Sequence, residues 1–102
     1  FLEAEKLLGQ QLRLAEEQLG AWHPWTLSAC HELGCFLQSR GKLFKASERH
    51  RQALAGREDQ LGAIHLETLG SAQQLAKVLQ DQGRLSEAED FYRRALQGQE
   101  EL

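Results

Sequence analysis

The chain has 102 residues, a net charge of −3 and 26% charged side chains, a size that suits one domain. No basic patch is wide enough to neutralise phosphates, so binding to nucleic acid is not expected. No apolar run approaches the roughly 18 residues of a membrane-spanning helix, so direct membrane insertion is not expected either.

The start of the chain and its two cysteines bear on its cellular origin. The sequence begins with Phe1 and contains no methionine, so we expect a piece of a longer protein. The alternative is a mature chain left after removal of a targeting peptide. Cys30 and Cys35 point in different directions on one predicted helix and are not expected to form a disulfide. This cysteine usage favours a reducing intracellular compartment, the cytoplasm or the interior of an organelle.

Hydrophobic periodicity predicts five amphipathic helices separated by short turns, and hence an all-α fold. The predicted helices cover residues 2–18, 25–39, 43–60, 67–81 and 85–101. Pro24 suits the first turn of the second helix, where its missing N–H costs nothing. Gly41 and Gly83 suit the tight turns between helices, because glycine takes positive φ at little cost.

One face of each predicted helix carries apolar or small residues that we expect to be buried. The expected core positions are Ala4, Leu7, Leu8, Gln11, Leu12 and Ala15, then Leu27, Cys30, Leu33, Gly34 and Leu37, then Ala46, His50, Ala53 and Leu54, then Leu69, Ala72, Leu75, Ala76 and Leu79, and finally Ala88, Phe91, Tyr92, Ala95 and Leu96. Small residues in these stripes would let paired helices approach closely. No helix precedes the first one in this chain, so part of its apolar face should be bare, namely Leu7, Leu8, Leu12 and Leu14.

The sequence repeats itself after 42 residues without a gap. The recurring positions include Leu19-Gly20-Ala21 with Leu61-Gly62-Ala63, His23 with His65, Thr26-Leu27 with Thr68-Leu69, and Gly41 with Gly83. A fixed period of this length, with two helices in each unit, predicts an α-solenoid of tandem helix–turn–helix units. We expect a single array of about two and a half repeats. Its units would be the second helix of a partial repeat at residues 1–18 and full repeats at residues 19–60 and 61–102.

Several further motifs accompany this period. They include His23-Pro24, Leu75-Ala76, Gln82-Gly83-Arg84, Ala88-Glu89, Phe91-Tyr92 and Ala95-Leu96. Together they resemble the tetratricopeptide repeat in the 42-residue form typified by kinesin light chains, and the resemblance covers essentially the whole chain. It implies a scaffold or adaptor that binds other proteins and has no catalytic activity.

The resemblance also implies a binding surface, because the first helix of each unit lines the inner face of such a superhelix. The expected groove residues are Ser28, His31, Cys35, Gln38, Ser39, Gly70, Gln73, Lys77, Gln80 and Asp81. They are mostly uncharged polar groups that could hydrogen-bond an extended or helical peptide. A single lysine is too little for the paired cationic clamp that grips a C-terminal carboxylate in chaperone-binding relatives.

Exposed aromatic and apolar residues form a second candidate surface, expected at Trp25, Trp22, Leu7 and Leu14. Trp25 stands where Glu67 stands in the next copy, so it should be exposed, and exposed tryptophan is enriched at interface hot spots. Trp22 is expected to pack in its loop, as its counterpart Ile64 would.

No catalytic, cofactor-binding or metal site is expected. His31 and Cys35 share a helical face with metal-ligand spacing, but no third ligand follows at a compatible spacing. His23 and His65 recur at one loop position, which indicates a structural role, such as tying backbone groups together between repeats. His50 replaces an aromatic that the resemblance implies, and we expect a core histidine.

The leading functional prediction is a non-catalytic protein–protein interaction module. The alternative is a structural subunit of a large multi-protein complex, in an organelle such as a chloroplast, with Trp25 and the end helices buried by neighbours. A third reading is the repeat region of an enzyme whose catalytic domain lies elsewhere in a longer chain.

Overall fold

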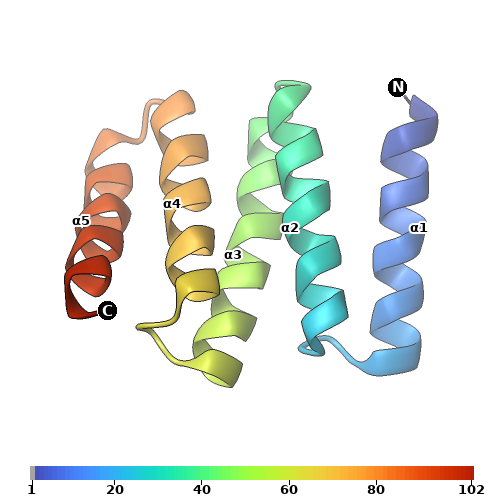
Figure 1. Ribbon diagram of the computed structural model, residues 1–102. Helices are drawn as coiled ribbons and strands as arrows, with labels where there is room; N and C mark the ends of the chain where they lie inside the picture. Colours follow the sequence, from blue (N-terminus) through green and yellow to red (C-terminus); the bar gives the residue numbers. More distant parts are fainter. Residues whose placement is uncertain (1) are drawn as a thin grey trace.

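The computed structural model describes residues 2–102 and contains five helices that follow one another along the molecule, with α3 set behind α2 (Figure 1). These are α1 (Leu2–Leu19), α2 (Pro24–Ser39), α3 (Leu43–Leu61), α4 (Leu66–Asp81) and α5 (Leu85–Glu101). Each helix packs antiparallel against the one before it, and α2 also contacts α4. The predicted all-α solenoid is confirmed, and the predicted helix ends agree with the observed ones to within one residue.

The first helix of each hairpin begins with a histidine cap. Nδ1 of His23 accepts a hydrogen bond from the Trp25 N–H, and Nδ1 of His65 accepts one from the Glu67 N–H, each at 3.1 Å. Both bonds satisfy a backbone donor that has no partner inside the helix. The expected structural role is therefore correct, but the bonds lie within one helical turn and do not join successive repeats.

Glycine ends the first helix of each hairpin. Gly41 and Gly83 have φ of 78° and 82°, the left-handed region that side chains with a Cβ disfavour. This turn lets the Lys42 N–H donate to the Leu37 carbonyl at 2.9 Å, and the Arg84 N–H repeats that bond to Leu79. The predicted tight turns are confirmed, and they reverse the chain into the next helix.

The buried core follows the middle of the row of helices. One cluster, which includes Leu12, Leu33 and Ala53, joins α1, α2 and α3 and reaches Val78 of α4. A second cluster joins α3, α4 and α5 around Leu54 and Leu75. The molecule measures only 14 Å in its thinnest direction, so every core residue lies within one helix layer of solvent. Alanines at the helix crossings are fully buried, as close approach of paired helices requires.

Burial at the two end helices departs from the sequence prediction. Tyr92 and Leu96 were expected in the core but are exposed, because no described element packs on the outer side of α5. On α1, Gln11 was also expected in the core and is exposed. Part of the expected bare face of α1 is covered instead, since Leu12 is buried in the core cluster and Leu8 is half-buried against it. Only Leu7 and Leu14 of the expected bare face remain exposed.

Gly34 and Gly70 form a matched pair for testing close packing. A Cβ on Gly34 would lie 2.9 Å from Cε1 and Nε2 of the fully buried His50 ring, whereas nothing lies within 4 Å of a Cβ on Gly70. Alanine favours a helix over glycine by about 1 kcal/mol, and overpacking a core costs about 1–3 kcal/mol. In urea unfolding, we expect Gly70→Ala to raise the free energy of unfolding by about 0.5–1 kcal/mol. We expect Gly34→Ala to lower it by up to about 2 kcal/mol. Equal stabilisation by both would show that the ring can move aside.

Candidate functional site

The candidate site is one side of the neighbouring helices α2 and α4, which run parallel (Figure 1). We call it the polar face, and it consists of Ser28, His31, Cys35, Gln38 and Ser39 on α2, and Gln73, Lys77, Gln80 and Asp81 on α4. The spacing of these residues places each set on one side of its helix. All nine are at least partly exposed, and the opposite side of each helix carries core residues such as Leu33 and Leu75. Whether a partner binds this face stays a prediction.

His31 and Cys35 lie next to each other at the middle of the polar face. Cys35 Sγ is 3.6 Å from His31 Nε2. Burial, assisted by the charge of Arg57, lowers the pKa of His31, and burial also raises the pKa of Cys35. Both groups are therefore uncharged near neutral pH, and an un-ionised thiol is a poor nucleophile. Within residues 2–102, no three histidine, cysteine or acidic side chains come together in a group that could hold a metal ion.

His50 lies directly beneath the polar face, and its ring centroid is 5.4 Å from that of His31 in an edge-to-face arrangement. The side chain is fully buried, and neither ring nitrogen has a hydrogen-bond partner within the described chain. Burial lowers the pKa of His50 to about 4, with further contributions from His31 and Arg57. The expected core histidine is confirmed, and it remains neutral at physiological pH.

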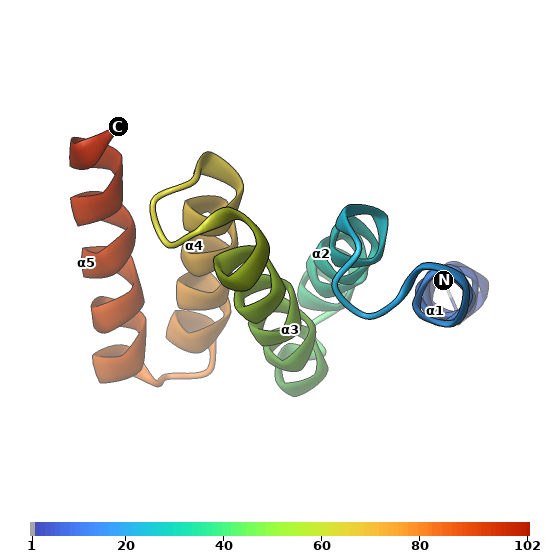
Figure 2. The same ribbon diagram turned by 90° about the horizontal axis from the view of Figure 1, so that it is seen from below.

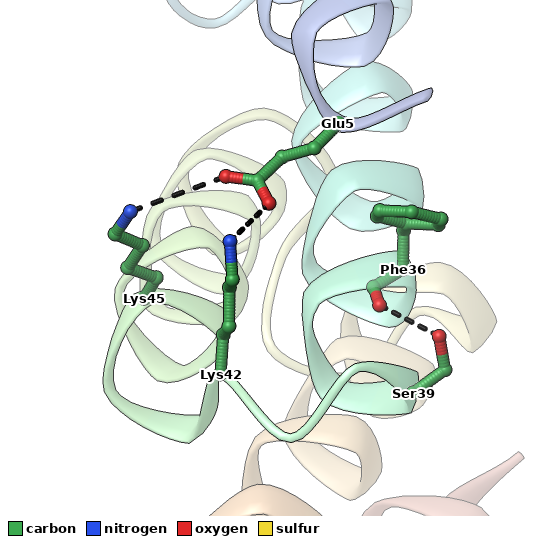
Figure 3. Close-up of polar contacts among 5 residues, drawn as sticks. All are labelled: Glu5, Phe36, Ser39, Lys42 and Lys45. Carbon is green, nitrogen blue, oxygen red and sulfur yellow. Dashed lines mark hydrogen bonds and ion pairs between the residues drawn. The ribbon is translucent and has the colours of Figure 1, made fainter. Parts of the chain in front are cut away.

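Part of the polar face is occupied by internal hydrogen bonds. The Ser39 hydroxyl donates to the Phe36 carbonyl at 2.7 Å (Figure 3), and the Tyr92 hydroxyl donates to Gln80 Oε1 at 3.1 Å. The side chains of Gln38 and Gln73, in contrast, make no hydrogen bond within residues 2–102. Their amide donors and acceptors, like the exposed polar groups of Ser28, Lys77 and Asp81, are therefore available to another molecule.

Ion pairs cross-link the other side of the row. Glu5 on α1 pairs with Lys42 and Lys45 at the start of α3 (Figure 3), and Arg94 on α5 pairs with Glu58 on α3. The Lys42 hydrogen bond is the main reason that the pKa of Glu5 is lowered. Figure 2 shows α3 displaced from α2 and α4, and these pairs connect it to the end helices. Exposed pairs of this kind contribute little stability.

The exposed apolar residues occupy separate elements. Leu7 and Leu14 are 59% and 53% exposed on α1, whereas Trp22 lies in the α1–α2 loop and is 43% exposed. Trp25, in the first turn of α2, is 72% exposed and contacts only the edge of the His23 ring among aromatic neighbours in residues 2–102. The prediction that Trp25 is exposed is confirmed. Trp22 packs in its loop only in part, with its indole against Gly56.

Sequence reasoning missed Arg57, which is the most buried charged residue in the described chain. Its Nη1 donates to the Ser71 hydroxyl at 2.8 Å and to the Glu67 carbonyl at 3.4 Å, so it joins α3 to α4. A signal was present, since Arg57 continues the inward stripe of Ala53 and Leu54 by one turn.

The comparisons with known proteins agree with this geometry. The profile of the tetratricopeptide repeat family matches residues 29–101. The chain belongs to the tetratricopeptide repeat family. Repeats of this family are generally protein-interaction modules and typically non-catalytic scaffolds.

The array described here has no helix, within residues 2–102, with the length and apolar character needed to cross a bilayer.

Two solved structures extend the comparison. Nearly identical tetratricopeptide-like repeats from a Podosopora anserina protein described as a kinesin light chain superpose with a TM-score of 0.89 at 30% identity. A point variant of those repeats gives a TM-score of 0.90 at 28% identity. Each comparison covers 96% of this chain but 46% of the other, so the chain spans about half the length of these relatives. No curated protein matches the sequence.

Proposed function

We propose that this tetratricopeptide array is a non-catalytic adaptor that holds a segment of another protein on its polar face. The supporting observation is that the side-chain amides of Gln38 on α2 and Gln73 on α4 make no hydrogen bond within residues 2–102, although they lie on two adjacent parallel helices. A primary amide both donates and accepts hydrogen bonds, as the backbone of an extended peptide requires. The uncharged thiol of Cys35 and imidazole of His31 on the same face suit a partner with few charges at this point.

Peptide selection followed by site mapping tests this proposal. Random peptides would be selected against the chain, and the bound peptide would be mapped by amide chemical shifts. The double substitution Gln38→Glu and Gln73→Glu keeps side-chain shape but removes both donors, so we expect at least a tenfold loss of affinity. Gln97→Glu on the exposed surface of α5 is the matched control and should leave affinity unchanged. Binding that maps away from the polar face would contradict the proposal.

A second candidate function is a structural subunit of a larger complex. It is supported by the exposed leucines on both end helices, Leu7 and Leu14 on α1 and Leu96 on α5, together with the exposed Trp25. Exposed apolar groups of this size mark interfaces with other protein. Such a chain should be marginally stable or self-associated by itself.

Thermal unfolding combined with light scattering distinguishes the two functions. A structural subunit should melt below about 60 °C or associate as its concentration rises. A monomer that unfolds cooperatively above about 60 °C would favour the adaptor.

A further inference from the structure

Arg57 is a buried cation without an acidic partner. Only 8% of the residue is exposed, yet no carboxylate within residues 2–102 lies within 4 Å of its guanidinium. A buried charge is strongly destabilising unless it is paired or extensively hydrogen-bonded. The structure therefore leaves the charge of Arg57 incompletely compensated.

The hydrogen bonds of the guanidinium are also incomplete. Arginine carries five N–H donors, and both internal bonds, to Ser71 and to the Glu67 carbonyl, come from Nη1. Nη2 and Nε make no hydrogen bond within the described chain, although neither is sealed from solvent. These two atoms form the edge of arginine that binds a carboxylate with two parallel hydrogen bonds.

A small pocket lies beside this guanidinium. It has a volume of about 70 Å³ and is lined by Pro24, Leu27, Arg57, Gln60, Leu61 and Glu67. A water molecule occupies about 30 Å³ in the liquid, so the pocket has room for a carboxylate group. Pro24, Leu27 and Leu61 supply apolar wall beside the guanidinium, and an ion pair is stronger next to such a surface than in open water.

The surrounding backbone adds positive potential. The pocket lies where α2 and α4 both begin, at Pro24 and Leu66, next to the end of α3 (Figure 1). Helix N-termini carry partial positive charge and favour anions. Two N-termini and a buried guanidinium favour an anion at this point, and the C-terminus of α3 at Leu61, which carries partial negative charge, partly opposes them. None of the residues that line the pocket belongs to the polar face.

We propose that this pocket is a carboxylate-binding site, in which Arg57 receives an acidic side chain or a chain terminus of a bound protein. Glu67 also lines the pocket, and its carboxylate opposes any entering anion, most strongly a multiply charged one. We therefore expect the site to prefer a single carboxylate over multiply charged anions and to bind it weakly. This proposal does not depend on peptide binding at the polar face.

Side-chain NMR of the 102-residue chain tests the site directly. The Arg57 Nε–H signal would be followed while sodium acetate replaces sodium chloride at constant ionic strength. We expect a saturable shift with half-saturation between about 1 and 100 mM. N-acetylaspartate amide and N-acetylglycine, used in turn, distinguish a side-chain carboxylate from a chain terminus by which of them saturates at lower concentration.

Three variants control the titration. Arg57→Lys keeps the charge but loses the planar pair of donors, so acetate affinity should fall at least tenfold. Arg93→Lys, at an exposed residue already paired with Glu89, should leave the acetate affinity of the Arg57 pocket unchanged. Glu67→Gln removes the competing charge and should tighten binding several-fold. This last variant keeps the test decisive if Arg57→Lys fails to fold.

The proposal would be overturned by an Arg57 signal that fails to saturate with any of the three carboxylates. A linear drift shared with exposed arginines, in both the natural chain and Glu67→Gln, would show that the pocket holds water alone.

Discussion

Truncation of Leu54 to alanine is expected to destabilise the chain by about 2–5 kcal/mol, whereas the same change at Leu96 should cost less than about 1 kcal/mol. The two leucines occupy one position in successive repeats, but Leu54 is 5% exposed and Leu96 is 59% exposed. Leu54 packs with Ala72, Leu75 and Leu79 of α4, and removing its side chain leaves a cavity there. Leu96 has no described helix on that side.

Urea unfolding of both variants measures the difference. Because the two substitutions are chemically identical and occupy the same repeat position, a difference between their losses of unfolding free energy reports whether a further helix covers the site. Leu12→Ala provides a third member of the series, since Leu12 is 2% exposed, and it should resemble Leu54→Ala. Equal losses at positions 54 and 96 would mean that the outer side of α5 is covered in solution.

The second large effect is a loss of stability on acidification, caused by His50. Burial lowers its pKa from 6.5 to about 4 in the folded chain, so between these values the unfolded chain binds more protons. Stability is therefore complete above about pH 6.5 and falls as the pH decreases toward 4. Linkage predicts a loss of about 2 kcal/mol between pH 7.5 and pH 5, and on the order of 3 kcal/mol by pH 4.

Replacement of His50 by leucine isolates this effect. Leucine is the residue at the same position of the preceding copy, Leu8, and it cannot be protonated. We expect His50→Leu to remove most of the dependence on pH between 7.5 and 5. His31→Gln, which copies the residue at position 73, should remove a smaller part, because His31 is only half-buried although burial lowers its pKa too. An unchanged pH profile in His50→Leu would assign the acid sensitivity to other groups.

Much of the fold could be predicted from local signals. Pro24 and Gly41 bound one helix because their backbone preferences act within a few residues. The 42-residue period predicted the order of helices, since each unit cannot bury its apolar stripe alone. The caps made by His23 and His65 were indicated by their recurrence, although the bonding partners were not.

The candidate sites were predictable to different extents. Helical spacing was enough to place His31 beside Cys35 on the polar face. The lack of internal partners at Gln38 and Gln73 required the full set of neighbours. Arg57 and its pocket escaped prediction because they depend on three segments, the starts of α2 and α4 and the end of α3, that are distant in the sequence.

The sequence by itself determined the helices, their turns, the repeat period and the family, because these follow from backbone preferences and from spacing along one chain. Tertiary structure alone decided which residues at equivalent repeat positions are buried. Leu54 and Leu96, or His50 and Tyr92, are equivalent in the repeat, yet their surroundings differ with the helix that covers them. Burial depends on neighbours in space, and the incompletely compensated charge of Arg57 arises in the same way.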